Sequence, residues 1–262
     1  MNSRSPIFNQ SRQKGFSLIE LAMVLLIIGL LLAGLVPTIS SLMEQKYRKE
    51  TTDKLEEIQQ ALIGFAITNN RLPCPAAATS NGVESFASGG DKQNGNCSHF
   101  FNGFVPAATL GISSSTSSSN TGYVEDAWGN RIRYAVTKYR PDSNYVFTAE
   151  EEMSKRGINK LFDSSNTVHL LVCSIASGIT NMDSSSASCA SGKSLTSKPG
   201  VPVIIYSIGK NGAQGGGSTD ELANLGDDRV FVSHSATNDF DDLMTWPSPG
   251  VLINRMVTAN RL

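Results

Sequence analysis

The sequence predicts an α+β fold, in which one long N-terminal helix, first transmembrane and then amphipathic, packs on a mostly antiparallel β-sheet. Three observations lead to this prediction. An apolar run occupies residues 21–36, an amphipathic stripe follows over residues 55–65, and short strand-like segments separated by turn residues fill much of the remainder. Because the helix precedes the strands instead of alternating with them, the pattern is typical of an α+β protein. The 262 residues suffice for a membrane helix and one globular domain.

The apolar run is long enough to cross a membrane. Residues 21–36 contain no polar side chain, and Glu20 is the only charged residue in the stretch 15–43. A bilayer core about 30 Å thick requires roughly 20 apolar residues in a helix. We therefore expect residues 16–38 to form a membrane helix. An ionisable group such as Glu20 costs about 2.5–3.5 kcal/mol in that setting, so we expect it to have a partner or a function.

A short motif precedes the run. Residues 14–20 read K-G-F-S-L-I-E, which resembles the processing site of type IV prepilins and of the pseudopilins of type II secretion. The resemblance implies that a prepilin peptidase and N-methyltransferase cuts after Gly15 and methylates the new terminus at Phe16. It also implies that Glu20 is the acid that this family carries at the fifth mature position.

Physical chemistry gives Glu20 a role after such a cut. The Phe16 amine would then be a cation one helical turn from Glu20 and on the same helix face. Pairing with this amine, or with that of a neighbouring subunit, would offset the desolvation of the carboxylate and give assembling subunits a register. The alternative is that Glu20 lies at headgroup depth, where the helix dipole favours an acid.

The charges around the apolar run predict its orientation. Residues 1–15, the predicted leader, carry a charge of +3, which leaves −4 for the remainder of a chain whose net charge is −1. Basic residues before a membrane helix favour a cytoplasmic N-terminus, so we expect an inner-membrane protein with a periplasmic C-terminal head. A conventional signal peptide would be cut after the run, but no A-x-A-like site closes it.

The helix is expected to continue through residues 39–72. Leu55, Ile58, Leu62 and Phe65 form one apolar stripe, and the pattern ends near Asn69. Pro37 resembles a proline that loosens the helix in pilins, and its missing backbone donor predicts a bend or local melting near residue 36.

Residues 73–262 form the predicted head. Strands are expected at residues 131–136, 145–148, 168–174, 201–207 and 229–233, with a final short helix near residues 251–256. The turn D-x-W-G-N at residues 126–130 resembles a segment of major pseudopilins in which the Trp packs the sheet onto the helix. The acidic run of Asp239, Asp241 and Asp242 is interpreted as the N-cap of the final helix; a metal-binding role is the less favoured alternative.

Four cysteines lie in the predicted head, an even number that favours disulfides in an exported domain. Cys74–Cys97 and Cys173–Cys189 form the simplest of three possible connectivities. The spacing does not match a zinc site.

A calcium ion is the candidate cofactor. The Gly-rich stretch 208–217 resembles the calcium loop of major pseudopilins, and oxygen donors could come from Asn211, Asp220, Asp227 and Asp228. The chain departs from that pattern, with Asn at 211 and displaced acids. A plain Gly-rich hairpin is the alternative.

The sequence favours an assembly role over catalysis. It has no G-x-S-x-G elbow, its Gly-rich stretch lacks the P-loop spacing, and its charge does not indicate a nucleic-acid surface. The resemblance implies prepilin peptidase, other pilin or pseudopilin subunits, the inner membrane and assembly platform proteins as partners. The alternatives are a single-pass membrane-anchored adhesin that does not polymerise and a membrane-anchored hydrolase whose site the sequence patterns do not reveal.

Overall fold

The structure is a computed structural model, and it describes residues 15–115, 120–157, 169–182 and 186–262, without the side chains of residues 33–39. The chain divides into two compact units, one up to Lys46 and one from Tyr47 to Leu262. The predicted leader lies outside the described residues except for Gly15.

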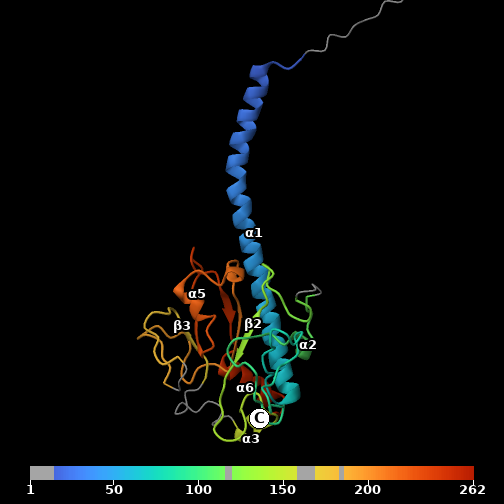
Figure 1. The fold of residues 1–262 in the computed structure, drawn as a ribbon, viewed down its shortest axis with the longest axis vertical. Helices are drawn as coiled ribbons and strands as arrows, with labels where there is room; N and C mark the ends of the chain where they lie inside the picture. The colour runs from blue at the N-terminus through green and yellow to red at the C-terminus, as the bar shows by residue number, and fades with distance from the viewer. Residues whose placement is uncertain (1–14, 116–119, 158–168, 183–185) are drawn as a thin grey trace, which may run out of the picture. The chain divides into compact units, whose positions relative to one another are not determined.

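A single helix, α1, spans Leu18–Asn69 and belongs in part to each unit (Figure 1). It starts two residues later than predicted, after Ser17. The helix continues without a break across Pro37, so the predicted local melting is not found. A proline removes only one donor from the hydrogen-bond ladder, and the turns on either side stay helical.

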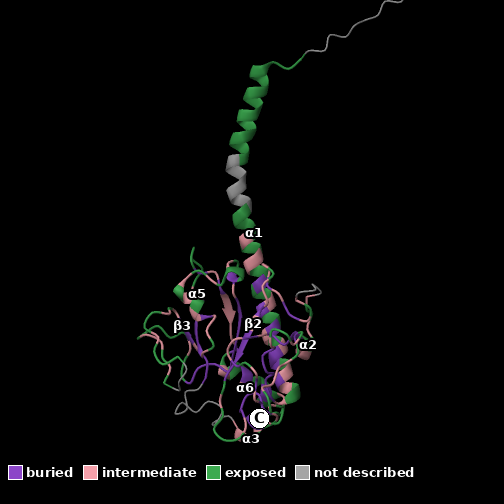
Figure 2. Ribbon diagram, viewed as in Figure 1, coloured by how far each residue is buried: buried purple, intermediate pink, exposed green. Residues whose placement is uncertain are grey.

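The N-terminal part of α1 presents apolar side chains that no other described part of the chain covers (Figure 2). Phe16, Leu18 and Leu30 are 86%, 88% and 69% exposed. Within the described residues, no helix combines the length and hydropathy that a membrane span requires. The membrane span at residues 16–38 stays a prediction.

The C-terminal part of α1 packs into the head through the predicted stripe. Leu55, Ile58 and Leu62 are each 1% exposed, and Ala66 continues the stripe in place of the half-buried Phe65. Burial of each large apolar side chain contributes about 1.5–3 kcal/mol.

The predicted mostly antiparallel sheet is confirmed. Strands β1 (Gly103–Phe104), β2 (Arg133–Val136), β4 (Val203–Ser207) and β6 (Leu243–Thr245) form one antiparallel sheet in the order β1-β2-β4-β6. Strands β3 (Leu171–Cys173) and β5 (Val230–Val232) form a separate parallel pair.

Strand β4 lies at the centre of the head, and all five of its residues are buried. Side chains alternate between the two faces of a strand. Val203 and Ile205 join the core formed with α1, whereas Ile204 and Tyr206 join a second core with the β3–β5 pair. Burial on both faces explains why residues 203–206 are uninterruptedly apolar.

Five short helices complete the described head: α2 (Ala107–Leu110), α3 (Glu152–Arg156), the 3₁₀ turn η1 (Gly212–Gln214), α5 (Thr219–Ala223) and α6 (Pro249–Thr258). The last confirms the predicted final helix. Its N-cap is Ser248, which accepts a hydrogen bond from the Val251 amide, so the acidic run at 239–242 does not cap it. That run instead leads into β6, a strand that the sequence did not predict.

The predicted strand at residues 145–148 is wrong. This segment is a turn, in which the Thr148 amide donates to the Tyr145 carbonyl. Tyr145, Val146 and Phe147 are all buried. Three consecutive apolar residues all enter the core here, whereas a half-buried strand would alternate. Residue 168, the first of another predicted strand, lies outside the described residues.

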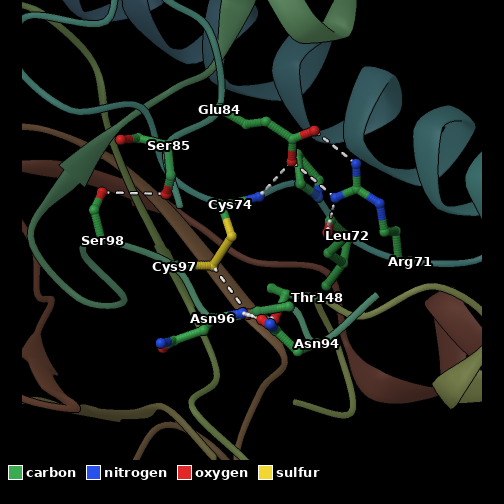
Figure 3. Close-up of a disulfide and its surroundings, with 12 residues drawn as sticks. Arg71, Leu72, Cys74, Glu84, Ser85, Asn94, Asn96, Cys97, Ser98 and Thr148 are labelled. Carbon is green, nitrogen blue, oxygen red and sulfur yellow. Dashed lines mark hydrogen bonds and ion pairs between the residues drawn. A yellow bond between two sulfur atoms is a disulfide. The ribbon is translucent and has the colours of Figure 1, made fainter. Parts of the chain in front are cut away.

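Both predicted disulfides are present, Cys74–Cys97 and Cys173–Cys189. The first lies next to a buried ion pair (Figure 3). Arg71, just after α1, donates to both carboxylate oxygens of Glu84 at 2.6 and 2.8 Å, and Glu84 also accepts from the Cys74 amide. The end of α1 is thus fixed to the head by a covalent bond and a bidentate ion pair.

Loss of this pair should be costly, because it leaves a charge buried without compensation. The side chains of Arg71 and Glu84 are only 2% and 7% exposed. We expect Glu84→Ala to lower the free energy of unfolding by about 3–5 kcal/mol, as measured by chemical denaturation of the purified chain.

The matched control is Asp53→Ala, which breaks the exposed Lys49–Asp53 pair on α1 and should change stability little. Equal effects of the two substitutions would contradict the importance of the buried pair.

Candidate functional site

The predicted cleavage site lies in non-helical chain just before α1. Residues 15–17 are outside any helix and exposed, and Phe16 is 86% exposed. No atom lies near the position that a side chain at Gly15 would occupy. A peptidase needs accessible backbone, and residues 15–17 are exposed and non-helical.

Ser17 sets the helix start. Its hydroxyl accepts a hydrogen bond from the Glu20 amide at 3.2 Å, which satisfies one of the backbone donors that a helix N-terminus leaves free. Glu20 lies in the first turn and is exposed, where the helix dipole favours an acid. The capping role of Ser17 was missed, although the S-x-x-E pattern at residues 17–20 could have revealed it.

Comparison with protein-family models agrees with this geometry. Residues 10–36 match the model of the prokaryotic N-terminal methylation motif. The chain therefore carries the hallmark of type IV pilins and pseudopilins. The motif covers Gly15, Phe16, Glu20 and the start of α1, and it supports a pilin-like subunit that a prepilin peptidase processes. No curated protein and no solved structure matches the chain.

The D-x-W-G-N turn connects α1 to the sheet, as the resemblance implied. Trp128 meets Tyr47 of α1 edge-on at 6.1 Å between ring centroids, and the Ala127 amide donates to the Thr51 hydroxyl of α1 at 3.1 Å. Asp126 is buried and accepts a hydrogen bond from the Ser207 hydroxyl at the end of β4. The turn therefore links the helix to the central strand.

The residues proposed as calcium ligands are individually engaged elsewhere. Asp220 accepts from the Ala176 amide and contacts the His234 ring, and Asp228 accepts from the Val230 amide. Asn211 turns its amide nitrogen toward Glu221. Asp227 is exposed. Among the described residues, Asp220, Asp227 and Asp228 do not form a group whose ligand atoms are close enough to share an ion.

A different acidic cluster was missed. Among the described residues, one group of acidic, His or Cys side chains lies close enough to share an ion, with ligand atoms within 4.8 Å of one another: Glu221, Asp241 and Asp242. Residue 209 must be glycine here, because φ is +62° and an added Cβ would lie 1.7 Å from an oxygen of Asp241.

The carboxylates of the cluster differ in their pKa. Burial alone would raise the pKa of Glu221, but hydrogen bonds from Gly217, Asp241 and Asn211 outweigh it and hold the pKa below its usual value. Burial raises the pKa of Asp242 to about 7; a hydrogen bond from Asn224 opposes this rise, and nearby Glu221 and Asp241 add to it. Asp242 is only 6% exposed.

Asp242 should therefore make stability depend on pH. Its pKa is higher in the folded state than in the unfolded chain, so the folded state binds more protons between these values and loses stability as pH rises toward about 7. We expect roughly 2 kcal/mol to be lost through this group between about pH 5 and about pH 8. Asp242→Asn should remove that loss in denaturation experiments across pH.

Asp239→Asn is the control, because Asp239 lies in the same acidic run but is exposed. Its pH profile should follow that of the unmodified chain. A profile for Asp242→Asn that also follows the unmodified chain would contradict the assignment.

Proposed function

We propose that this chain is a subunit of a type IV pilus-like filament or of a type II secretion pseudopilus. The observation that carries the proposal is the methylation motif at residues 10–36, which ends in an apolar helix that the chain does not cover. Contiguous exposed apolar surface of this kind is typical of contacts with a membrane or another protein. The function in this proposal is assembly through the N-terminal helix.

In this proposal the precursor lies in the inner membrane, with its N-terminus in the cytoplasm and its head in the periplasm. Both disulfides lie in the head, which agrees with an oxidising compartment. Prepilin peptidase cuts the exposed Gly15–Phe16 bond and methylates Phe16. Assembly platform proteins then move the helix from lipid into a filament, where neighbouring helices cover its apolar side chains.

In this assembly Glu20 sets the axial position of each subunit's helix relative to its neighbour. It is the only charged residue in the stretch 15–43, so it is the only side chain there that can neutralise a terminal ammonium. Pairing with the amine of a neighbouring Phe16 removes the cost of leaving either charge alone among apolar helices.

The mature N-terminus tests processing directly. In the chain purified from its native membrane, mass spectrometry should find N-methyl-Phe16 as the first residue, and Gly15→Val should retain the leader. A mature chain that still begins at Met1, or that begins beyond Pro37, would overturn the proposal.

Substitution of Glu20 tests assembly separately from cleavage. We expect Glu20→Ala to be cleaved normally but to reduce filament incorporation on the order of tenfold or more, as measured by crosslinking between subunits in the membrane. The control is Glu57→Ala, which removes an exposed acid farther along α1 and should assemble normally.

A membrane-anchored adhesin that does not polymerise is the alternative. Its helix would serve only as an anchor, so Glu20→Ala would leave its crosslinking pattern unchanged.

A further inference from the structure

Three carboxylates meet where the Gly-rich stretch, α5 and the segment before β6 come together. Ligand atoms of Glu221, Asp241 and Asp242 lie within 4.8 Å of one another, and Glu221 and Asp242 are only 1% and 6% exposed. Among the described residues, no Lys or Arg forms an ion pair with any of the three. The charges of Arg48 and Arg133 act on Asp241 and Asp242 only from a distance. We propose that this cluster binds a calcium ion.

Oxygen atoms at the cluster lack hydrogen-bond donors. Oδ1 of Asp241 and Oδ1 of Asn211 are enclosed by the protein, and neither accepts a hydrogen bond. Asn211 lies beside the cluster, because its Nδ2 donates to Oε2 of Glu221 at 2.9 Å. Oε1 of Glu221 accepts one hydrogen bond, from the Asp241 amide at 2.8 Å, although a carboxylate oxygen has two lone pairs. Buried polar atoms normally have a partner, so these free lone pairs point to a cation.

Asp242 contributes the third carboxylate. Its Oδ2 accepts from Nδ2 of Asn224 at 2.8 Å, and its Oδ1 accepts no hydrogen bond from the part of the chain that the structure describes. The Asn224 side chain is itself fixed, because it pairs with the amide and the carbonyl of Val232 in β5. The Asp242 carboxylate is therefore held in place before any ion binds, and such preorganisation lowers the cost of binding.

The Gly-rich stretch positions the other two carboxylates through its backbone. The amides of Gly217 and Ser218 donate to Oε2 of Glu221 at 2.5 and 3.3 Å. The Lys210 amide donates to Oδ2 of Asp241 at 3.2 Å. In both side chains these bonds fall on one oxygen, and the second oxygen keeps lone pairs for a ligand.

The donor set suits calcium. Calcium binds carboxylate and amide oxygens at about 2.3–2.6 Å, so oxygens on opposite sides of the ion lie about 4.6–5.2 Å apart. The 4.8 Å within which the ligand atoms of the cluster lie agrees with this span. The three acids and Asn211 offer only oxygen, whereas structural zinc sites are built mainly from Cys and His. Of the residues that the sequence suggested for calcium, only Asn211 takes part.

A bound ion would join three segments that are far apart in the sequence: the Gly-rich stretch after β4, α5 and the segment that leads into β6. The ion would therefore stabilise the head. The inference is independent of the proposed filament role, because it concerns ion binding by the head and not processing or assembly of the N-terminal helix.

Thermal unfolding of the full-length chain in detergent, after treatment with a chelator, tests the site. Calcium alone, at about a hundredfold its Kd, should raise the Tm by about 5–10 °C, because a ligand that binds the folded state stabilises it. Equilibrium dialysis with labelled calcium should show binding, and Asp241→Asn should weaken it about tenfold or more, since the variant loses one ligand charge. An unchanged Tm without calcium binding would overturn the proposal and assign the free lone pairs to water.

Asp227→Asn is the matched control, because Asp227 is an exposed acid of the set that the sequence suggested. It should keep the calcium affinity and the Tm rise of the unmodified chain. Equal calcium affinities for Asp241→Asn and Asp227→Asn would overturn the proposal. An equal Tm rise with magnesium would do the same, because magnesium demands shorter, near-octahedral coordination. If Asp241→Asn does not fold, Asp242→Asn takes its place with the same expected loss of affinity.

Discussion

The constraint on which this protein depends is that the first part of α1 has apolar side chains that the described residues of the chain leave exposed. Phe16, Leu18 and the residues that follow are exposed, whereas the second part of the same helix buries Leu55, Ile58 and Leu62 in the head. One helix thus serves two environments. Exposed apolar surface of this kind is typical of contacts with a membrane or another protein, and the methylation motif at residues 10–36 includes this part of the helix.

The head is organised so that α1 enters it at a fixed place. The Arg71–Glu84 pair and the Cys74–Cys97 disulfide hold the end of the helix, and Trp128 and Thr51 hold it near the entry to the head. Strand β4, buried on both faces, transmits this anchorage to the β3–β5 pair.

Polar groups, more than additional apolar area, determine how the loops of the head close. Glu221 and Asn224 on the short α5 satisfy backbone groups from segments far apart in the sequence. The buried Asn224 uses both its oxygen and its nitrogen in this way, pairing with the amide and the carbonyl of Val232. Asp242 is the buried carboxylate of this region whose charged form costs the most. Burial raises its pKa to about 7 and makes the stability of the fold depend on pH near neutrality.

The sequence by itself determined the features that depend on local pattern. These are the processing motif at residues 14–20, the long helix with its stripe, the main strands and the final helix, because periodicity and short motifs report local environment. Only the tertiary structure decided the turn at residues 145–148, strand β6 and the grouping of Glu221 with Asp241 and Asp242. Those outcomes depend on which distant segments meet: Asp241 reaches Glu221, and Asp220 reaches Ala176, across separations that no local pattern encodes.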